Sequence, residues 1–170
     1  VLVVGAGIAG LSAAVTLAEA GIEVLVVDQA ARSGGNIYRQ PNPGAAHHRR
    51  SKQRDKTWPR LMARIDLCRQ SLTIQCRTRF VGVDQFGVSF ISDMEGGNSR
   101  FVQPTAVIVA TGATERMDPR PGWTLPGVMT AGAIQTMLKA TGEPPKGKIV
   151  LAGSGPLLLA IGAELTATGN

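Results

Sequence analysis

Residues Val1 to Asp28 read VLVVGAGIAGLSAAVTLAEAGIEVLVVD, and this stretch decides the fold. Its first four residues are apolar and mostly β-branched, which favours a parallel strand buried on both faces. The glycine-rich turn GAGIAG follows at once, and apolar residues then recur at helical spacing until Gly21, which is placed to end the helix. Val24 to Val27 is a second apolar strand. The stretch therefore predicts a strand, a turn, a helix and a strand in one unit.

The spacing of the turn is suited to binding a dinucleotide. Gly5 can form a tight turn, Gly7 lets backbone approach a pyrophosphate, and Gly10 lets the helix pack closely on the strand. A helix that begins here directs unpaired N–H groups and its positive dipole end toward phosphates. Asp28 ends the second strand where a carboxylate can accept hydrogen bonds from a ribose. The predicted binding residues in this stretch are Gly5, Ala6, Gly7, Ile8, Ala9, Gly10, Asp28 and Gln29. A turn that serves packing alone, and a solvated acid at position 28, are the alternatives.

The net charge of +6 is concentrated in one stretch. Residues 32–60 contain eight Lys or Arg and one acid, so they carry +7 and the rest of the chain carries −1. Tyr38 and Trp58 are the only aromatic residues there, and no nucleic-acid-binding module is present. We therefore favour a solvated face or a subunit contact over nucleic-acid binding, and an acidic partner or an anionic membrane surface would fit the same charge.

Other classes of function find little support. No apolar run reaches the length of about 18 residues that spans a bilayer, and no signal peptide precedes the first strand. Both observations favour a cytoplasmic protein, and membrane association is the alternative. The chain begins inside a strand without Met, which suggests an excised segment. Cys68 and Cys76 fit no common zinc or redox spacing and predict reduced, partly buried thiols. His47 and His48 have no further clustered ligands, so no metal site is predicted.

A small β-meander, placed at 84–104, interrupts the α/β order. It contains a predicted hairpin turn at Glu95 to Asn98. The apolar run at 106–110 that follows is typical of a central parallel strand. The other elements predicted from periodicity are a helix over 59–70, strands at 72–76 and 78–83, a strand around Phe86, Val88 and Phe90, a return strand at 101–102, a helix that Thr130 caps and that runs to about Ala140, and a linker at 141–147.

Two further segments carry glycines where backbone can lie close to a ligand. The doublet Gly34-Gly35 follows the second strand, and Ala110-Thr111-Gly112 ends the apolar run, at the strand edge where open α/β sheets bind ligands. A solvent-exposed turn is the alternative for the doublet.

The pattern begins again near the end of the chain. Ile149 to Ala152 predicts a strand, and Gly153 and Gly155 recur 148 positions after Gly5 and Gly7. Leu158 stands where the first copy has Gly10, and Pro156 lies in the turn itself. The chain is therefore predicted to be α/β, with a Rossmann-like domain over 1–145 that includes the meander, and the truncated start of a second one over 146–170. The strand at 149–152 would lack neighbours and leave an exposed edge, so we expect this segment to fold poorly alone.

These residues resemble the pyridine nucleotide-disulfide oxidoreductase superfamily of FAD-dependent proteins. Two longer strings, GGNIYRQP at 34–41 and RPGWTLPGVMTAGAIQTMLKATGEPPKGKIVLAGSGPLLLA at 120–160, look like the FAD-type subunits of opine oxidases and hydrogen cyanide synthase, with the sarcosine oxidase α subunit more distant. The resemblance implies that the first turn, the doublet and residues 110–112 bind FAD. It implies NAD(P) or another adenine nucleotide at Gly153 and Gly155, a site that Leu158 and Pro156 put in doubt.

The resemblance also implies a function. The chain would belong to a subunit of an amine or amino-acid dehydrogenase complex that passes electrons between flavin centres, beside an iron–sulfur component and a second flavoprotein subunit. The alternatives are an independent NAD(P)H-dependent reductase and a non-catalytic nucleotide-binding subunit. No Cys-x₄-Cys pair follows the doublet, which argues against a dithiol relay there. No His, Ser or Cys stands in a catalytic constellation, so no catalytic residue is predicted.

Overall fold

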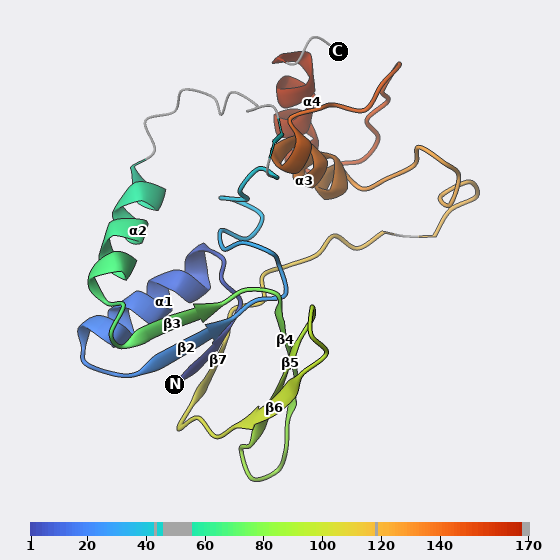
Figure 1. Cartoon of the computed structure of the whole chain (residues 1–170). Coiled ribbons are helices and arrows are strands. Elements are labelled where there is room, and N and C mark those ends of the chain that lie inside the picture. The colour runs from blue at the N-terminus through green and yellow to red at the C-terminus, as the bar shows by residue number, and fades with distance from the viewer. Residues whose placement is uncertain (43, 46–55, 118, 168–170) are drawn as a thin grey trace. The chain divides into compact units, whose positions relative to one another are not determined.

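The computed structural model describes residues 1–42, 44–45, 56–117 and 119–167 (Figure 1). The chain forms two compact units, which we describe separately. Unit 1 consists of Val1–Arg39 and Gln53–Gly112, and unit 2 of Gln40–Lys52 and Ala113–Asn170. Residues 113–145 thus group with the carboxyl-terminal helix, whereas the predicted first nucleotide domain, at 1–145, includes them. The boundary between the first and the second nucleotide-binding domain, placed between residues 145 and 146, stays a prediction.

Unit 1 is built on a four-stranded parallel sheet, as the apolar strands predicted. Val3 pairs with Val26 on one side and with Ile108 on the other. The strands β1 (Leu2–Val4), β2 (Val24–Val27), β3 (Leu72–Gln75) and β7 (Val107–Val109) are arranged in the order β3-β2-β1-β7. Among the described residues β7 is therefore an edge strand, and the prediction of a central strand at 106–110 was wrong. Val107 and Ile108 are half-buried against the two clusters on the sheet faces, whereas Val109 is 69% exposed.

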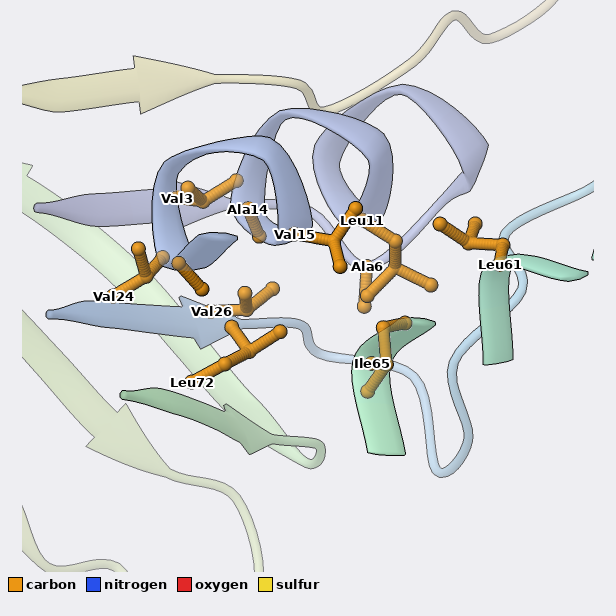
Figure 2. Close-up of a cluster of buried hydrophobic side chains, with 11 residues drawn as sticks. Val3, Ala6, Leu11, Ala14, Val15, Val24, Val26, Leu61, Ile65 and Leu72 are labelled. Atoms are coloured by element: carbon orange, nitrogen blue, oxygen red, sulfur yellow. The ribbon is translucent and has the colours of Figure 1, made fainter. Parts of the chain in front are cut away.

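Two helices cover one face of this sheet. Helix α1 (Ile8–Glu19) ends before Gly21, whose φ of +79° confirms it as the residue that terminates the helix. Helix α2 (Thr57–Leu67) begins two residues before the predicted Pro59 and ends three before Gln70. Pro59 fits in the first turn of α2 because the backbone N–H groups of that turn, one of which proline lacks, have no partner within the helix. Figure 2 shows the resulting core, in which Val3, Ala6, Leu11, Ala14, Val15, Val24, Val26, Leu61, Ile65 and Leu72 pack together.

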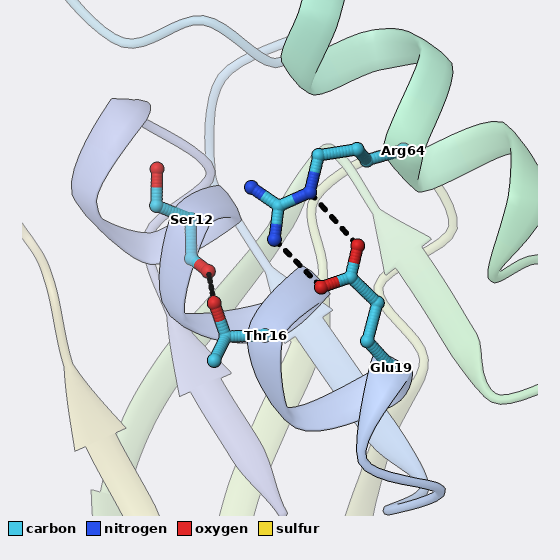
Figure 3. Close-up of polar contacts among 4 residues, drawn as sticks. All are labelled: Ser12, Thr16, Glu19 and Arg64. Atoms are coloured by element: carbon cyan, nitrogen blue, oxygen red, sulfur yellow. Dashed lines mark hydrogen bonds and ion pairs between the residues drawn. The ribbon is translucent and has the colours of Figure 1, made fainter.

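An ion pair joins the two helices (Figure 3). The Arg64 guanidinium on α2 donates from Nε and Nη2 to the two carboxylate oxygens of Glu19 at the end of α1, at 2.8 and 2.6 Å. This hydrogen-bonded pairing holds the pKa of Glu19 below its ordinary value and raises the pKa of Arg64. Nearby, the Thr16 hydroxyl donates to the Ser12 carbonyl within α1.

The other face of the sheet is covered by the β-meander. Its strands β4 (Thr78–Val83), β5 (Ser89–Asp93) and β6 (Ser99–Val102) pair antiparallel in that order. The meander therefore begins at Thr78, and its predicted start at 84 was wrong because β4 is its first strand. Phe86 and Val88 precede β5 rather than lying in it. The hairpin at 95–98 is confirmed, since the Asp93 N–H donates to the Asn98 carbonyl across it.

Unit 2 is organised by two helices, α3 (Ala131–Thr141) and α4 (Leu157–Ala167). The predicted cap is confirmed, because Thr130 Oγ1 accepts a hydrogen bond from the Ala133 N–H at 3.1 Å. The buried side chains that join the helices are Ile134, Leu138, Ile161 and Leu165. The predicted strand at 149–152 is not formed within the described part of the chain. It has no neighbouring strand to pair with there, and Val150 is 82% exposed.

Two expectations concern the whole chain. None of the helices in the described ranges is long and apolar enough to cross a membrane. Of the basic stretch at 32–60, residues 43 and 46–55 lie outside the described residues, and with them His47 and His48.

Candidate functional site

The glycine-rich turn connects β1 to α1 without a side-chain cap. Gly7 is the N-cap residue of α1, and it makes no side-chain cap hydrogen bond. The first turn of α1 carries no acid either. Because the first N–H groups of a helix have no partner within it, this end of α1 is suited to an anionic group.

The end of β7 fixes the shape of the turn. The Ala110 N–H donates to the Val4 carbonyl at 2.8 Å. A side chain on Gly5, whose φ is +111°, would collide with the Ala110 carbonyl, and a side chain on Gly10 would collide with the Gly5 carbonyl. Both positions therefore require glycine, and the predicted segment at 110–112 begins directly beside the turn.

The glycine doublet lies against the same turn. The Gly34 N–H donates to the Ala6 carbonyl at 2.8 Å. A Cβ atom on Gly35 would lie 3.0 Å from the Gly7 Cα, whereas a Cβ atom on Gly7 would have 3.8 Å to the Gly35 Cα. Gly7 thus borders a space that one methyl group could enter without disturbing the fold.

Asp28 joins the end of β2 to this turn. Its Oδ2 accepts a hydrogen bond from the Ala6 N–H at 2.6 Å, and its Oδ1 accepts one from the Ala30 N–H at 2.7 Å. Each carboxylate oxygen has a further lone pair, so a ribose hydroxyl could still donate to it. Sequence reasoning placed Asp28 near the site but missed its bond to the turn.

The remaining predicted positions lie at the margin. Gln29 and Ala9 are exposed, and Ile8 is half-buried. Thr111 and Gly112 are exposed, and a Cβ atom on Gly112 would meet nothing within 4 Å. The structure therefore brings together four segments of the predicted first site, which are separated by up to a hundred or so positions in the sequence: the turn, Asp28, the doublet and the end of β7.

Residues 3–53 match the family described as NAD(P)-binding Rossmann-like domain. Unit 1 has a Rossmann-like fold. Over 99% of its length the chain is 40% identical to an opine oxidase subunit of Agrobacterium tumefaciens (strain Ach5) and 34% identical to hydrogen cyanide synthase subunit HcnB of Pseudomonas aeruginosa. It spans 34% and 36% of these two relatives, about a third of their length. The resemblance to opine oxidase and hydrogen cyanide synthase subunits is confirmed.

Solved structures agree with this Rossmann-like fold. The L-proline dehydrogenase of P. horikoshii superposes with a TM-score of 0.63, over 81% of this chain and 27% of that one, at 17% sequence identity. The predicted α/β fold with a parallel sheet is therefore confirmed. The fold and the relatives support FAD as the dinucleotide, and the open space at Gly7 and the uncapped helix end fit such a group.

The second glycine turn differs from that of the Rossmann-like domain. Leu158 occupies the position of Gly10, and its Cδ1 lies 2.8 Å from the point where a Cβ atom on Gly153 would be. Pro156 removes one N–H from the turn. The leucine side chain thus lies over Gly153, whereas Gly10 in the first turn packs directly against the Gly5 carbonyl. These residues do not fit a pyrophosphate as the first turn does, and we derive no step through a nucleotide at Gly153 and Gly155.

One thiol lies close to the Rossmann-like site. Cys76 follows β3 and is half-buried, and both cysteines are free, as predicted. Burial raises the pKa of the Cys76 thiol, and the negative charge of Asp28 raises it further. The neutral thiol is therefore favoured over the nucleophilic thiolate. Among the described residues no three His, Cys, Asp or Glu side chains form a metal-binding group.

Two aromatic residues near the site were missed as a pair. Tyr38 and Trp58 stack with ring centroids 5.0 Å apart. They are the only Phe, Trp or Tyr residues in the basic stretch at 32–60. This was the signal in the sequence from which their contact could have been predicted.

Proposed function

We propose that this chain is the FAD-binding part of an oxidoreductase subunit that works in a complex oxidising amines or amino acids of the opine type. The observation that carries the proposal is the convergence of the doublet, Asp28 and the end of β7 on the turn at Gly5 to Gly10. The relatives support it, because they are named as subunits of opine oxidase, hydrogen cyanide synthase and, at 30% identity, sarcosine oxidase.

In this proposal each segment has its own task. The N–H groups at the start of α1 bind the pyrophosphate, and Gly7 leaves the space for it. Asp28 accepts hydrogen bonds from the ribose, while the doublet and residues 110–112 let the ligand approach backbone. FAD, when bound, accepts the electrons of the oxidation. The proposed partners are an iron–sulfur component and a second flavoprotein subunit.

The first test is the absorption spectrum of the full-length protein, followed by identification of the nucleotide that heat releases. Flavin bands and released FAD are expected. A colourless protein that releases only an adenine nucleotide would contradict the proposal and favour a nucleotide-binding scaffold. Flavin reduction by an amine only when the partner subunit is present would support the complex, whereas reduction by NAD(P)H alone would favour an independent reductase.

Gly7→Ala separates FAD binding from folding. The added methyl group has ordinary contacts with the protein but enters the space proposed for the pyrophosphate. We expect FAD to bind roughly 5- to 150-fold more weakly, the typical effect of an overpacked contact. The melting temperature of the protein from which FAD has been removed should change little, because FAD stabilises only the form that binds it. Gly82→Ala in β4 is the matched control, because its Cβ atom would meet nothing within 4 Å and it lies in the meander. Equal FAD affinity in the Gly7→Ala variant and the control would place the pyrophosphate elsewhere.

A further inference from the structure

An aromatic stack lies where the chain leaves and re-enters unit 1. The rings of Tyr38 and Trp58 are 5.0 Å apart at their centroids, and their planes are inclined by 19°. Tyr38 directly precedes Arg39, the last residue of the first segment of unit 1, and Trp58 lies in the first turn of α2. The stack therefore connects the two segments of this unit.

Tyr38 is also bonded to the glycine doublet. Its N–H donates to the Gly34 carbonyl at 3.0 Å, and a side chain on Gly34 would collide with the Tyr38 carbonyl. Gly34 in turn donates its N–H to the Ala6 carbonyl in the glycine-rich turn. A continuous series of contacts thus runs from Trp58 through Tyr38 and Gly34 to the turn.

The doublet needs such support. Gly34 and Gly35 have φ values of +124° and +59°. Glycine loses more conformational freedom on folding than any other residue, so two consecutive glycines in these conformations are costly to order. A stacked ring four residues after Gly34 restrains the segment without placing a side chain near the turn.

We propose that Trp58 is a positioning residue for the dinucleotide, which holds the Gly34-Gly35 doublet against the turn through the ring of Tyr38. This inference rests on the proposed FAD site. Loss of the stack should weaken FAD binding by roughly 2- to 12-fold, the range that corresponds to a typical aromatic pair.

The test uses the full-length protein with two measurements. Amide hydrogen exchange of residues 33–39 is recorded without nucleotide, and the FAD dissociation constant is measured on protein from which FAD has been removed. In Trp58→Ala we expect faster exchange at the Gly34 and Tyr38 amides and weaker FAD binding. Trp58→Phe keeps a ring and should restore both. Phe86→Ala, which removes a ring that is 75% exposed in the meander, should change neither.

Each outcome decides a different point. Unchanged exchange in Trp58→Ala would overturn the inference, and so would faster exchange with unchanged FAD affinity. Wild-type protein that binds no FAD would instead overturn the proposed function, and the inference with it, while the exchange data would still show whether the stack restrains the doublet. If Trp58→Ala does not fold, Tyr38→Leu removes the stack from the other side.

Discussion

At the scale of single residues, Asp28 stabilises the glycine-rich turn in addition to its proposed role in binding the ribose. Its two oxygens accept hydrogen bonds from different backbone N–H groups, those of Ala6 and Ala30. Bonds from N–H groups to a carboxylate are stronger than neutral ones. The residue proposed to bind ribose is therefore held in place by the turn that is proposed to bind the pyrophosphate.

Asp28→Asn should lower the free energy of unfolding by about 1–3 kcal/mol, because the new NH₂ group would face one of the two backbone N–H groups and leave it unsatisfied. Asp84 offers the matched control. Its Oδ1 alone accepts from both the Phe86 and Val88 N–H groups, so the single oxygen of Asn can replace it. Urea unfolding should show a change below about 0.5 kcal/mol for Asp84→Asn. Equal effects of the two substitutions would contradict the role given to Asp28.

At the scale of elements, α1 and α2 are joined by the Glu19–Arg64 pair on their exposed sides. Glu19 lies at the carboxyl end of α1, where the helix dipole disfavours an acid. The bidentate guanidinium offsets this, and it is the main reason why the pKa of Glu19 is lowered. The folded protein therefore binds this proton less readily than the unfolded chain, and the pair stabilises the fold only while Glu19 is ionised.

The Glu19→Gln variant should melt slightly below wild type at neutral pH, because exposed pairs contribute little. The difference should persist above the ordinary pKa of a Glu side chain and vanish as the pH falls through the lowered pKa of Glu19. Melting temperatures measured at pH values from about 7 to about 3 check this, since ordinary Glu side chains titrate between these limits. Glu143→Gln, at an exposed position after α3 that makes no ion pair among the described residues, controls for general loss of charge. A difference in melting temperature that grows as the pH falls would contradict the stabilising role of the Glu19–Arg64 pair.

Local pattern was enough to predict α1, β2, the Thr130 cap and the hairpin at 95–98. Each depends on residues close in sequence, such as the Gly21 that ends α1. The edge position of β7 could not be predicted, because an apolar run records burial but not which strands pair beside it. That the segment at 149–152 lacks neighbouring strands follows from the sequence, whereas its failure to form a strand came from the fold. For the same reason the sequence indicated Gly34-Gly35 and Ala110-Thr111-Gly112 separately, whereas their common contact with the turn came from the fold.

At the scale of the whole molecule, the two glycine turns are unequal copies. Gly10 in the first turn has Leu158 as its counterpart, and the leucine side chain lies over Gly153. The repetition in sequence is therefore not a repetition of the same local structure.

We predict that the full-length protein, without its partner subunit, carries one FAD per chain and binds no NAD⁺ at the second turn. Chromatography of the released nucleotides and calorimetric titration with NAD⁺ measure this. Leu158→Gly should gain NAD⁺ binding, and Leu159→Gly, which removes a side chain that is 79% exposed, is its control. A second nucleotide bound in equimolar amount by wild-type protein would contradict the prediction.

The pairing of β1 with β7 has a consequence for biosynthesis. Strand β1 needs a neighbour, β7, that begins only at Val107 and is therefore synthesised much later. At typical rates of synthesis, of about 5–20 residues per second, roughly 5 to 20 seconds separate the two strands. During that interval one side of β1 has only solvent or a chaperone to cover it. Slower translation of the meander would lengthen this exposure, so codon choice between β2 and β7 should influence the yield of folded protein.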